Sequence, residues 1–159
     1  MTLRNHIDRI LGTFVVLLMA ILVINVLWQV ASRYLMGHPS SFTDELAGFL
    51  LIWVGLFGSA FITGKKQHLA IDLLHTKLSP AGKIRIDKFI NILIALFALV
   101  VLVAGGSNLV YITLHLKQIS SALQIPVGYV YTVLPISGIF IMYYTIDDLI
   151  HPQIKKSTN

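Results

Sequence analysis

The sequence contains no cysteine, which excludes disulfides, thiolate metal sites and Cys-ligated iron–sulfur clusters. Charged residues are also scarce, because they form 12% of the chain against about 25% in soluble domains. Hydrophobic residues form 56% of the sequence, and the few charges are absent from several long stretches. A chain of 159 residues with this composition predicts one domain, and that domain is expected to lie in a membrane.

Four runs of the sequence lack Asp, Glu, Lys and Arg, and they cover approximately residues 10–32, 46–64, 89–116 and 125–146. The second run has 19 residues, which as a helix spans roughly 28 Å, close to the thickness of a bilayer core. The first run has 23 residues and exceeds the roughly 7–15 residues of a signal-peptide core, which favours an uncleaved span. We therefore predict an all-α integral membrane protein with four transmembrane helices in a single domain, residues 1–159.

Two of the predicted spans have features of their own. The run 89–116 has 28 residues, or about 42 Å as a helix, so this helix should tilt or project beyond the bilayer core. Pro135 lies inside the last run and should kink it, since proline removes one backbone hydrogen bond. Ser79 followed by Pro80 is typical of an N-cap and first helical position, so we predict a short interfacial helix leading into the third span.

The distribution of Lys and Arg predicts the orientation. The N-terminal segment, the segment 65–88 and the C-terminal tail together carry ten, whereas the other two connections carry only Arg33 and Lys117. With an even number of spans, this bias places both termini in the cytoplasm, an N-in, C-in topology. The formal net charge of +5 is explained by these clusters beside apolar runs, so nucleic acid is not an expected partner.

An acidic, capped turn opens the second span. Ser41 precedes Asp44 by three residues, so its hydroxyl is placed to cap the first free N–H groups of the helix. Asp44 and Glu45 complement the positive end of the helix dipole. Arg33 ends the first span 12 residues before Glu45, at the facing end of an antiparallel neighbour. We predict an ion pair between Arg33 and Glu45 across this turn.

Small residues recur within the spans. Gly48, Gly55 and Ser59 fall on one face of the second helix, at offsets of seven and four. Gly105 and Gly106 begin a second small patch in the third span. Small residues let two helices approach closely in a membrane, so both patches are predicted to pack against other helices.

No span carries the ionisable groups that a pump or small exporter usually needs, and His115 is the only histidine within one, at its extreme end. A cytochrome-like electron carrier would need histidines facing one another inside the bundle. The sequence also lacks a nucleophile with its base, a phosphate-binding glycine loop and a carboxylate dyad, so no enzyme is expected. A stand-alone four-helix exporter or electron carrier is the competing class.

His68, Asp72 and His75 fall on one helical face in the basic segment after the second span. Metal binding would require a partly dry, preformed site, yet these residues follow two lysines in a cytoplasmic connection. We favour His68 and Asp72 as a hydrogen-bonded or paired set at the wet end of the second helix.

A pattern of residue types runs through the first two spans and the turn after them: Arg33, Phe42, Asp44, Glu45, Trp53, Gly55, His68 and Asp72. This pattern resembles the small membrane subunit of tripartite ATP-independent periplasmic (TRAP) transporters, the DctQ/SiaQ type. The resemblance covers the whole chain in length, number of spans and orientation.

The resemblance implies a scaffold subunit of the bacterial inner membrane that binds a much larger membrane subunit. In that family the large subunit moves the substrate together with sodium, and a soluble periplasmic protein delivers the substrate. The substrates are usually organic acids, including C4-dicarboxylates and sialic acids. No cofactor is expected on this subunit, and sodium coupling is expected in the large one. The small-residue faces at Gly48, Gly55, Ser59, Gly105 and Gly106 are then expected to pack against the large subunit.

Two short segments reach the predicted periplasmic side, residues 33–45 and 117–124. Their sparse, mostly basic or neutral side chains are Arg33, His38, Ser40, Lys117 and Gln118. We predict that this set helps to dock the soluble binding protein, although Arg33 and Lys117 could equally well extend to lipid headgroups.

Overall fold

The computed structural model describes residues 2–35, 37, 40–65 and 80–150. Its helices are α1 (Thr2–Leu35), α2 (Ser41–Gly64), α4 (Pro80–Phe97), the π-helix η1 (Ala98–Gly105), α5 (Gly106–His115), α6 (Val127–Tyr131) and α7 (Val133–Ile150). Within the described ranges no strand is formed, and the β-structure is one isolated bridge between Ile119 and Pro126. Four helical stretches are long and apolar enough to cross a membrane, which confirms the predicted number of spans.

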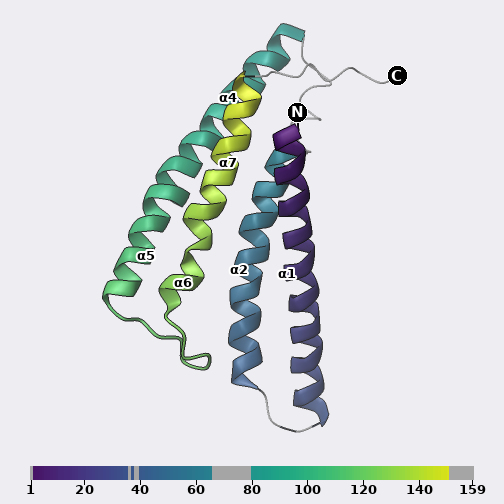
Figure 1. Ribbon diagram of the computed structural model, residues 1–159, viewed down its shortest axis with the longest axis vertical. Helices are drawn as coiled ribbons and strands as arrows, with labels where there is room; N and C mark the ends of the chain where they lie inside the picture. The colour runs from purple at the N-terminus through teal and green to yellow at the C-terminus, as the bar shows by residue number, and fades with distance from the viewer. Residues whose placement is uncertain (1, 36, 38–39, 66–79, 151–159) are drawn as a thin grey trace.

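The helices form two antiparallel pairs (Figure 1). One pair is α1 with α2; in the other, the continuous α4–η1–α5 rod runs antiparallel to α6–α7. Helix α7 joins the pairs, because it packs against α2 on one side and against α4 and η1 on the other. The start of α1, the end of α2, the start of α4 and the end of α7 meet at one end, and below the contact the two pairs diverge.

The helix ends extend beyond the uncharged runs. The first span covers Arg4–Leu35, because the charged flanks of the run contain no residue that stops a helix. The third span begins in α4, which runs from Pro80 without interruption into η1. The prediction of a separate short interfacial helix at Pro80 is therefore wrong: no glycine or proline follows Gly82 to end the first turns, so the helix continues into the membrane segment. The predicted cap, Ser79, lies outside the described residues.

The fourth span is interrupted, as its proline predicts. Helix α6 ends at Tyr131 and α7 begins at Val133, four and two residues before Pro135, whose missing N–H would otherwise bond the Tyr131 carbonyl oxygen. Thr132 lies at the break, and its hydroxyl donates a hydrogen bond of 2.6 Å to the Tyr129 carbonyl oxygen. The Thr132 N–H donates a hydrogen bond of 3.3 Å to the same oxygen, so a single residue holds the end of α6.

The π-helix η1 packs closely on α7. A Cβ placed on Gly138 of α7 would lie 2.8 Å from Leu102 Cβ and 2.9 Å from a methyl carbon of Val103, so only glycine permits this approach. A few residues along, Gly106 faces Leu134 in the same way, at 2.7 Å from its Cβ. Close backbone approach therefore holds α7 against the rod.

An aromatic cluster lies where the two helix pairs meet. Phe57 of α2 lies with its ring centroid 5.2 Å from Phe14 of α1 and 6.3 Å from Phe140 of α7. Trp53 Nε1 donates a hydrogen bond of 2.9 Å to the Val130 carbonyl oxygen, so an indole also bridges the pairs. In the most apolar window of each of the first three spans, however, only 17% of the residues are buried. Most of the apolar surface therefore faces outward, toward lipid or another protein.

Candidate functional site

Charged side chains of the described residues lie near the helix ends and not in the middle of the spans. No group of three or more His, Asp or Glu residues in this part of the chain is placed to hold a metal ion. The candidate functional regions are therefore the two ends of the helix pairs and the outward faces of the helices.

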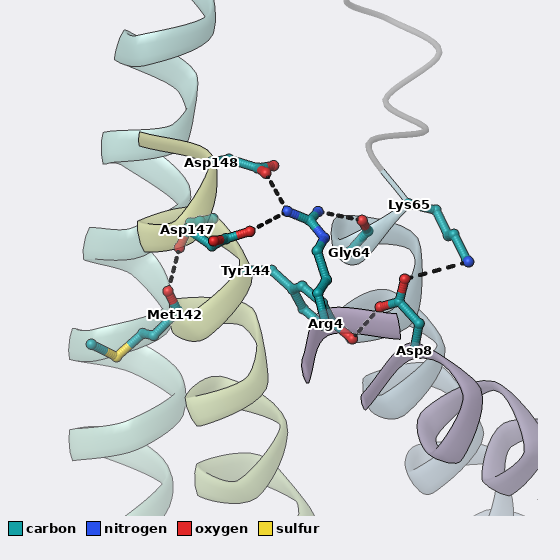
Figure 2. Close-up of polar contacts among 9 residues, drawn as sticks. Arg4, Asp8, Gly64, Lys65, Met142, Tyr144, Asp147 and Asp148 are labelled. Atoms are coloured by element: carbon teal, nitrogen blue, oxygen red, sulfur yellow. Dashed lines mark hydrogen bonds and ion pairs between the residues drawn. The ribbon is translucent and has the colours of Figure 1, made fainter. Parts of the chain in front are cut away.

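At the end where α1 begins and α7 ends, Arg4 connects three helices (Figure 2). Its guanidinium forms ion pairs with Asp147 and Asp148 of α7, the second at 2.8 Å. Its other terminal nitrogen donates a hydrogen bond of 2.6 Å to the Gly64 carbonyl oxygen at the end of α2. One α1 side chain thus contacts the last turns of both α2 and α7, which lie in different helix pairs.

Tyr144 lies at the centre of the same cluster and is fully buried. Its hydroxyl donates a hydrogen bond of 2.7 Å to Asp8, and Asp8 also pairs with Lys65 at 3.4 Å. The Arg4 guanidinium lies over the Tyr144 ring, 5.5 Å from its centroid. A Cβ on Gly64 would lie 2.7 Å from that ring, so glycine is required where α2 ends.

These six residues form what we call the terminal cluster: Arg4, Asp8, Lys65, Tyr144, Asp147 and Asp148. The sequence alone does not predict this cluster, because its members are up to 144 residues apart. One signal was available: opposite charges flank the first and last spans, and both flanks were predicted on the same side of the membrane. The cluster ties the two helix pairs together at that side.

At the opposite end, the Glu45 carboxylate holds the connection between α5 and α6. It accepts hydrogen bonds from the backbone N–H groups of Ser121 (3.2 Å), Ala122 (2.7 Å) and Leu123 (2.9 Å). The Ser120 hydroxyl donates a fourth hydrogen bond of 2.9 Å. The loop donors converge on one carboxylate from α2, so this contact fixes the loop against the other helix pair.

The predicted ion pair between Arg33 and Glu45 is therefore wrong. The Glu45 oxygens are occupied by loop donors that have no helical partner of their own, and Arg33 is exposed and forms no ion pair with any described acidic residue. Side-chain amides of α1 make the contacts at this end instead. Asn25 donates to the Thr43 carbonyl oxygen at 2.7 Å, and Gln29 donates to Asp44 at 2.8 Å.

The cap of α2 is Ser40, one residue before the predicted Ser41. The Ser40 hydroxyl accepts a hydrogen bond of 3.4 Å from the Thr43 N–H. Ser40 is one of the residues predicted to dock a binding protein, and its hydroxyl already takes part in this cap. Two others, Lys117 and Gln118, are exposed in the loop after α5, and Lys117 has a left-handed φ of 49°. The predicted residue His38 lies outside the described residues.

The two small-residue patches differ in what they face. Gly48, Gly55 and Ser59 are exposed, and a Cβ on either glycine would meet nothing within 4 Å among the described residues beyond its own stretch of helix. Gly106 is buried against α7, so the prediction that it faces a second protein is wrong; Gly105, one residue earlier, is exposed. We call Gly48, Gly55 and Ser59 the open face of α2.

The remaining predicted site residues, His68 and Asp72, lie outside the described residues, as does His75. Neither pairing between them nor metal binding by them is tested by the structure.

Comparison with known proteins identifies the family. Residues 22–153 match the sequence model of the DctQ component of the tripartite ATP-independent periplasmic transporters. A TRAP transporter small permease protein of Haemophilus influenzae is 27% identical over 149 residues, which cover 94% of this chain and 91% of that protein. The sialic acid TRAP transporter small permease protein SiaQ of Vibrio cholerae is 28% identical over 151 residues, covering 92% and 83% of the two chains.

A third relative is much longer than this chain. The sialic acid TRAP transporter permease protein SiaT of Haemophilus influenzae is 33% identical over 89 residues, which are 56% of this chain and 13% of that protein. The family model covers most of the chain, and the two similar small permeases match nearly end to end. The chain belongs to the DctQ component family of the TRAP transporters and is a small membrane subunit of such a transporter.

Proposed function

We propose that this subunit is the scaffold of a sodium-coupled, binding-protein-dependent importer of an organic acid. Its α2 helix holds the large permease subunit through the open face. The observation that carries this proposal is the open face itself: the other side of α2 is packed inside the chain through Phe57 and Ala60, whereas Gly48 and Gly55 have nothing against them.

The open face suits a helix of another protein. Because α2 has glycine at positions 48 and 55, a neighbouring helix can approach its backbone closely. In lipid the hydrophobic effect does not drive helices together, so close packing of this kind drives their association instead. The SiaT relative supports the choice of partner, because a segment similar to this chain is there part of a long permease chain. In that relative the similar segment and the rest of the permease are one covalent chain, which fits a small and a large subunit that are neighbours in the membrane.

We also propose that the end with the terminal cluster lies in the cytoplasm. The described cations at that end are Arg4, Arg9, Lys65, Arg85 and Lys88, whereas the other end has Arg33 and Lys117. This asymmetry follows the positive-inside rule. The loop held by Glu45 then faces the periplasm, where Arg33, Ser40, Lys117 and Gln118 would meet the soluble binding protein, together with His38 from outside the described ranges.

The substrate is proposed to be an organic acid of the sialic acid or dicarboxylate class. Two of the relatives carry sialic acid in their names, which supports the first of these. The family match also favours a transporter subunit over a stand-alone exporter or electron carrier.

A substitution on the open face tests the proposed assembly. Gly55→Leu should reduce co-purification of the large subunit severalfold, because the new side chain keeps the partner helix away. The lone chain should keep its unfolding temperature, since nothing within 4 Å meets a Cβ at Gly55. Ala20→Leu, a similar enlargement at an exposed position of α1, is the matched control. Undiminished co-purification with Gly55→Leu would refute the α2 interface.

A further inference from the structure

A hollow of about 450 Å³ lies beside the terminal cluster, between the first turns of α1 and the last turn of α2. It is lined by Asn5, Asp8, Arg9, Gly12, Phe61 and Lys65. On α1 the lining positions 5, 9 and 12 follow a helical stripe, and on α2 Phe61 and Lys65 are one turn apart. The proposed scaffold role, which depends on the open face of α2, does not involve this hollow.

The charges of the hollow favour an anion. Arg9 is exposed and has no ion-pair partner among the described residues, and the Lys65 side chain is 44% exposed. The one carboxylate in the lining, Asp8, is already engaged by the Tyr144 hydroxyl and by Lys65. Two cations and one carboxylate leave a formal charge of +1, which complements the single negative charge of a phosphodiester.

The position of the hollow points to a lipid. Arg9 immediately precedes the uncharged run of α1, and Lys65 immediately follows that of α2, so both cations lie at the same boundary of the membrane. Below them the wall becomes apolar: the edge of the Phe61 ring lies against Gly12, where a Cβ would come within 2.9 Å of it. Val16, one turn further along the same stripe of α1, is 67% exposed. A headgroup at the cations would therefore have its acyl chain beside an apolar surface of α1.

We propose that this hollow is a binding site for an anionic phospholipid of the phosphatidylglycerol class. The Arg9 guanidinium holds the phosphate through paired N–H donors, Lys65 adds a point charge, and one acyl chain follows the surface from Gly12 to Val16. Basic pockets between transmembrane helices at the membrane surface are suited to anionic headgroups in this way. A zwitterionic lipid lacks the net charge that the site complements, and a free phosphate leaves the apolar wall unused.

Native mass spectrometry of the full chain in a neutral detergent tests the proposal, with three probes added in turn: phosphatidylglycerol, phosphatidylcholine of the same acyl chains, and glycerol 3-phosphate. We expect one phosphatidylglycerol to bind saturably and the other two probes to bind at least tenfold more weakly. Arg9→Gln and Lys65→Gln should each weaken binding about fivefold, which corresponds to about 1 kcal/mol per basic residue near the membrane surface. The double variant Arg9→Gln, Lys65→Gln should bind phosphatidylglycerol roughly 25-fold more weakly, because the two effects multiply.

The matched control is the double variant Arg33→Gln, Lys117→Gln, which removes two exposed cations from the opposite end of the bundle. It should leave the saturable site intact. Gly12→Leu keeps every charge and fills the apolar wall, so it should also weaken phosphatidylglycerol binding, with helical circular dichroism confirming the fold. The proposal is overturned if the control double variant loses as much binding as Arg9→Gln, Lys65→Gln, or if phosphatidylcholine or glycerol 3-phosphate binds as tightly as phosphatidylglycerol.

Discussion

Removing the hydroxyl of Tyr144 tests directly whether the terminal cluster holds the helix pairs together. Tyr144→Phe deletes one hydrogen bond, of 2.7 Å to a charged acceptor, and keeps the buried ring. Hydrogen bonds to charged groups contribute about 1.5–3 kcal/mol, so we expect the free energy of unfolding to fall by about that amount. The lower part of the range is favoured, because Asp8 keeps its ion pair with Lys65 at 3.4 Å.

A second substitution at the same position separates packing from hydrogen bonding. Tyr144→Ala also removes a fully buried ring that lies beneath Arg4 and against Gly64. Truncating a buried aromatic side chain costs about 3–5 kcal/mol, so this variant should be clearly less stable than Tyr144→Phe. The double change Arg4→Gln, Tyr144→Phe should cost less than the sum of its parts, since both residues belong to one network.

The assay is reversible unfolding of the purified chain in mixed micelles, followed by circular dichroism. Tyr129→Phe is the matched control, because Tyr129 is 62% exposed at the opposite end of the bundle. It should change the free energy of unfolding by no more than about 0.5 kcal/mol. If Tyr144→Phe is no more destabilising than Tyr129→Phe, the terminal cluster does not hold the helix pairs together.

Three further predictions concern the ends of the bundle. The chain has no cysteine, so Gln118→Cys should react with a membrane-impermeant maleimide from the periplasmic side, and His6→Cys only after the inner membrane is opened. Glu45→Gln should speed amide hydrogen exchange at residues 121–123, because those N–H groups lose a charged acceptor. Lys117→Glu should slow uptake at limiting binding protein and be rescued by excess binding protein, since charges at the edge of an interface act mainly on association rate.

Each of these predictions has an outcome that contradicts it. A reversed labelling pattern would place the terminal cluster in the periplasm. Unchanged exchange at residues 121–123 in Glu45→Gln, or an equal effect of Arg33→Gln, would favour the ion pair between Arg33 and Glu45 over the contacts of Glu45 with the loop. Uptake by Lys117→Glu that equals the unsubstituted subunit at low binding protein would leave Lys117 as a contact to lipid headgroups only.

The spans could be predicted from the sequence because a bilayer imposes a local rule, and the family because its pattern of residue types is read directly along the chain. An uncharged run of sufficient length needs no knowledge of its neighbours, and neither does the interruption before Pro135. Helical spacing is also local, and it places Gly48 and Gly55 on one side of α2; that this side is open comes from the structure.

The contacts of the two ends could not be predicted, because they depend on which helices become neighbours. Proximity in the sequence pairs Glu45 with Arg33, yet the residues that donate hydrogen bonds to Glu45 are 75 to 78 residues away. Gly106 was assigned to a second protein because spacing does not distinguish an inner face from an outer one. The π-helix could not be predicted either. Because η1 is apolar on every side, its sequence has no hydrophobic periodicity that would indicate the helix type.

Reconstitution into vesicles tests whether this subunit is a scaffold that the transporter needs but that moves no substrate by itself. Vesicles with an inward sodium gradient are prepared with this subunit alone, with the large permease subunit alone, and with both, each in the presence of the soluble binding protein and a labelled sialic acid or C4-dicarboxylate. The account predicts sodium-dependent uptake only when both membrane subunits are present, and none by this subunit alone above protein-free vesicles. Uptake by this subunit alone would contradict the scaffold role, and full uptake by the large subunit alone would show that transport does not need it.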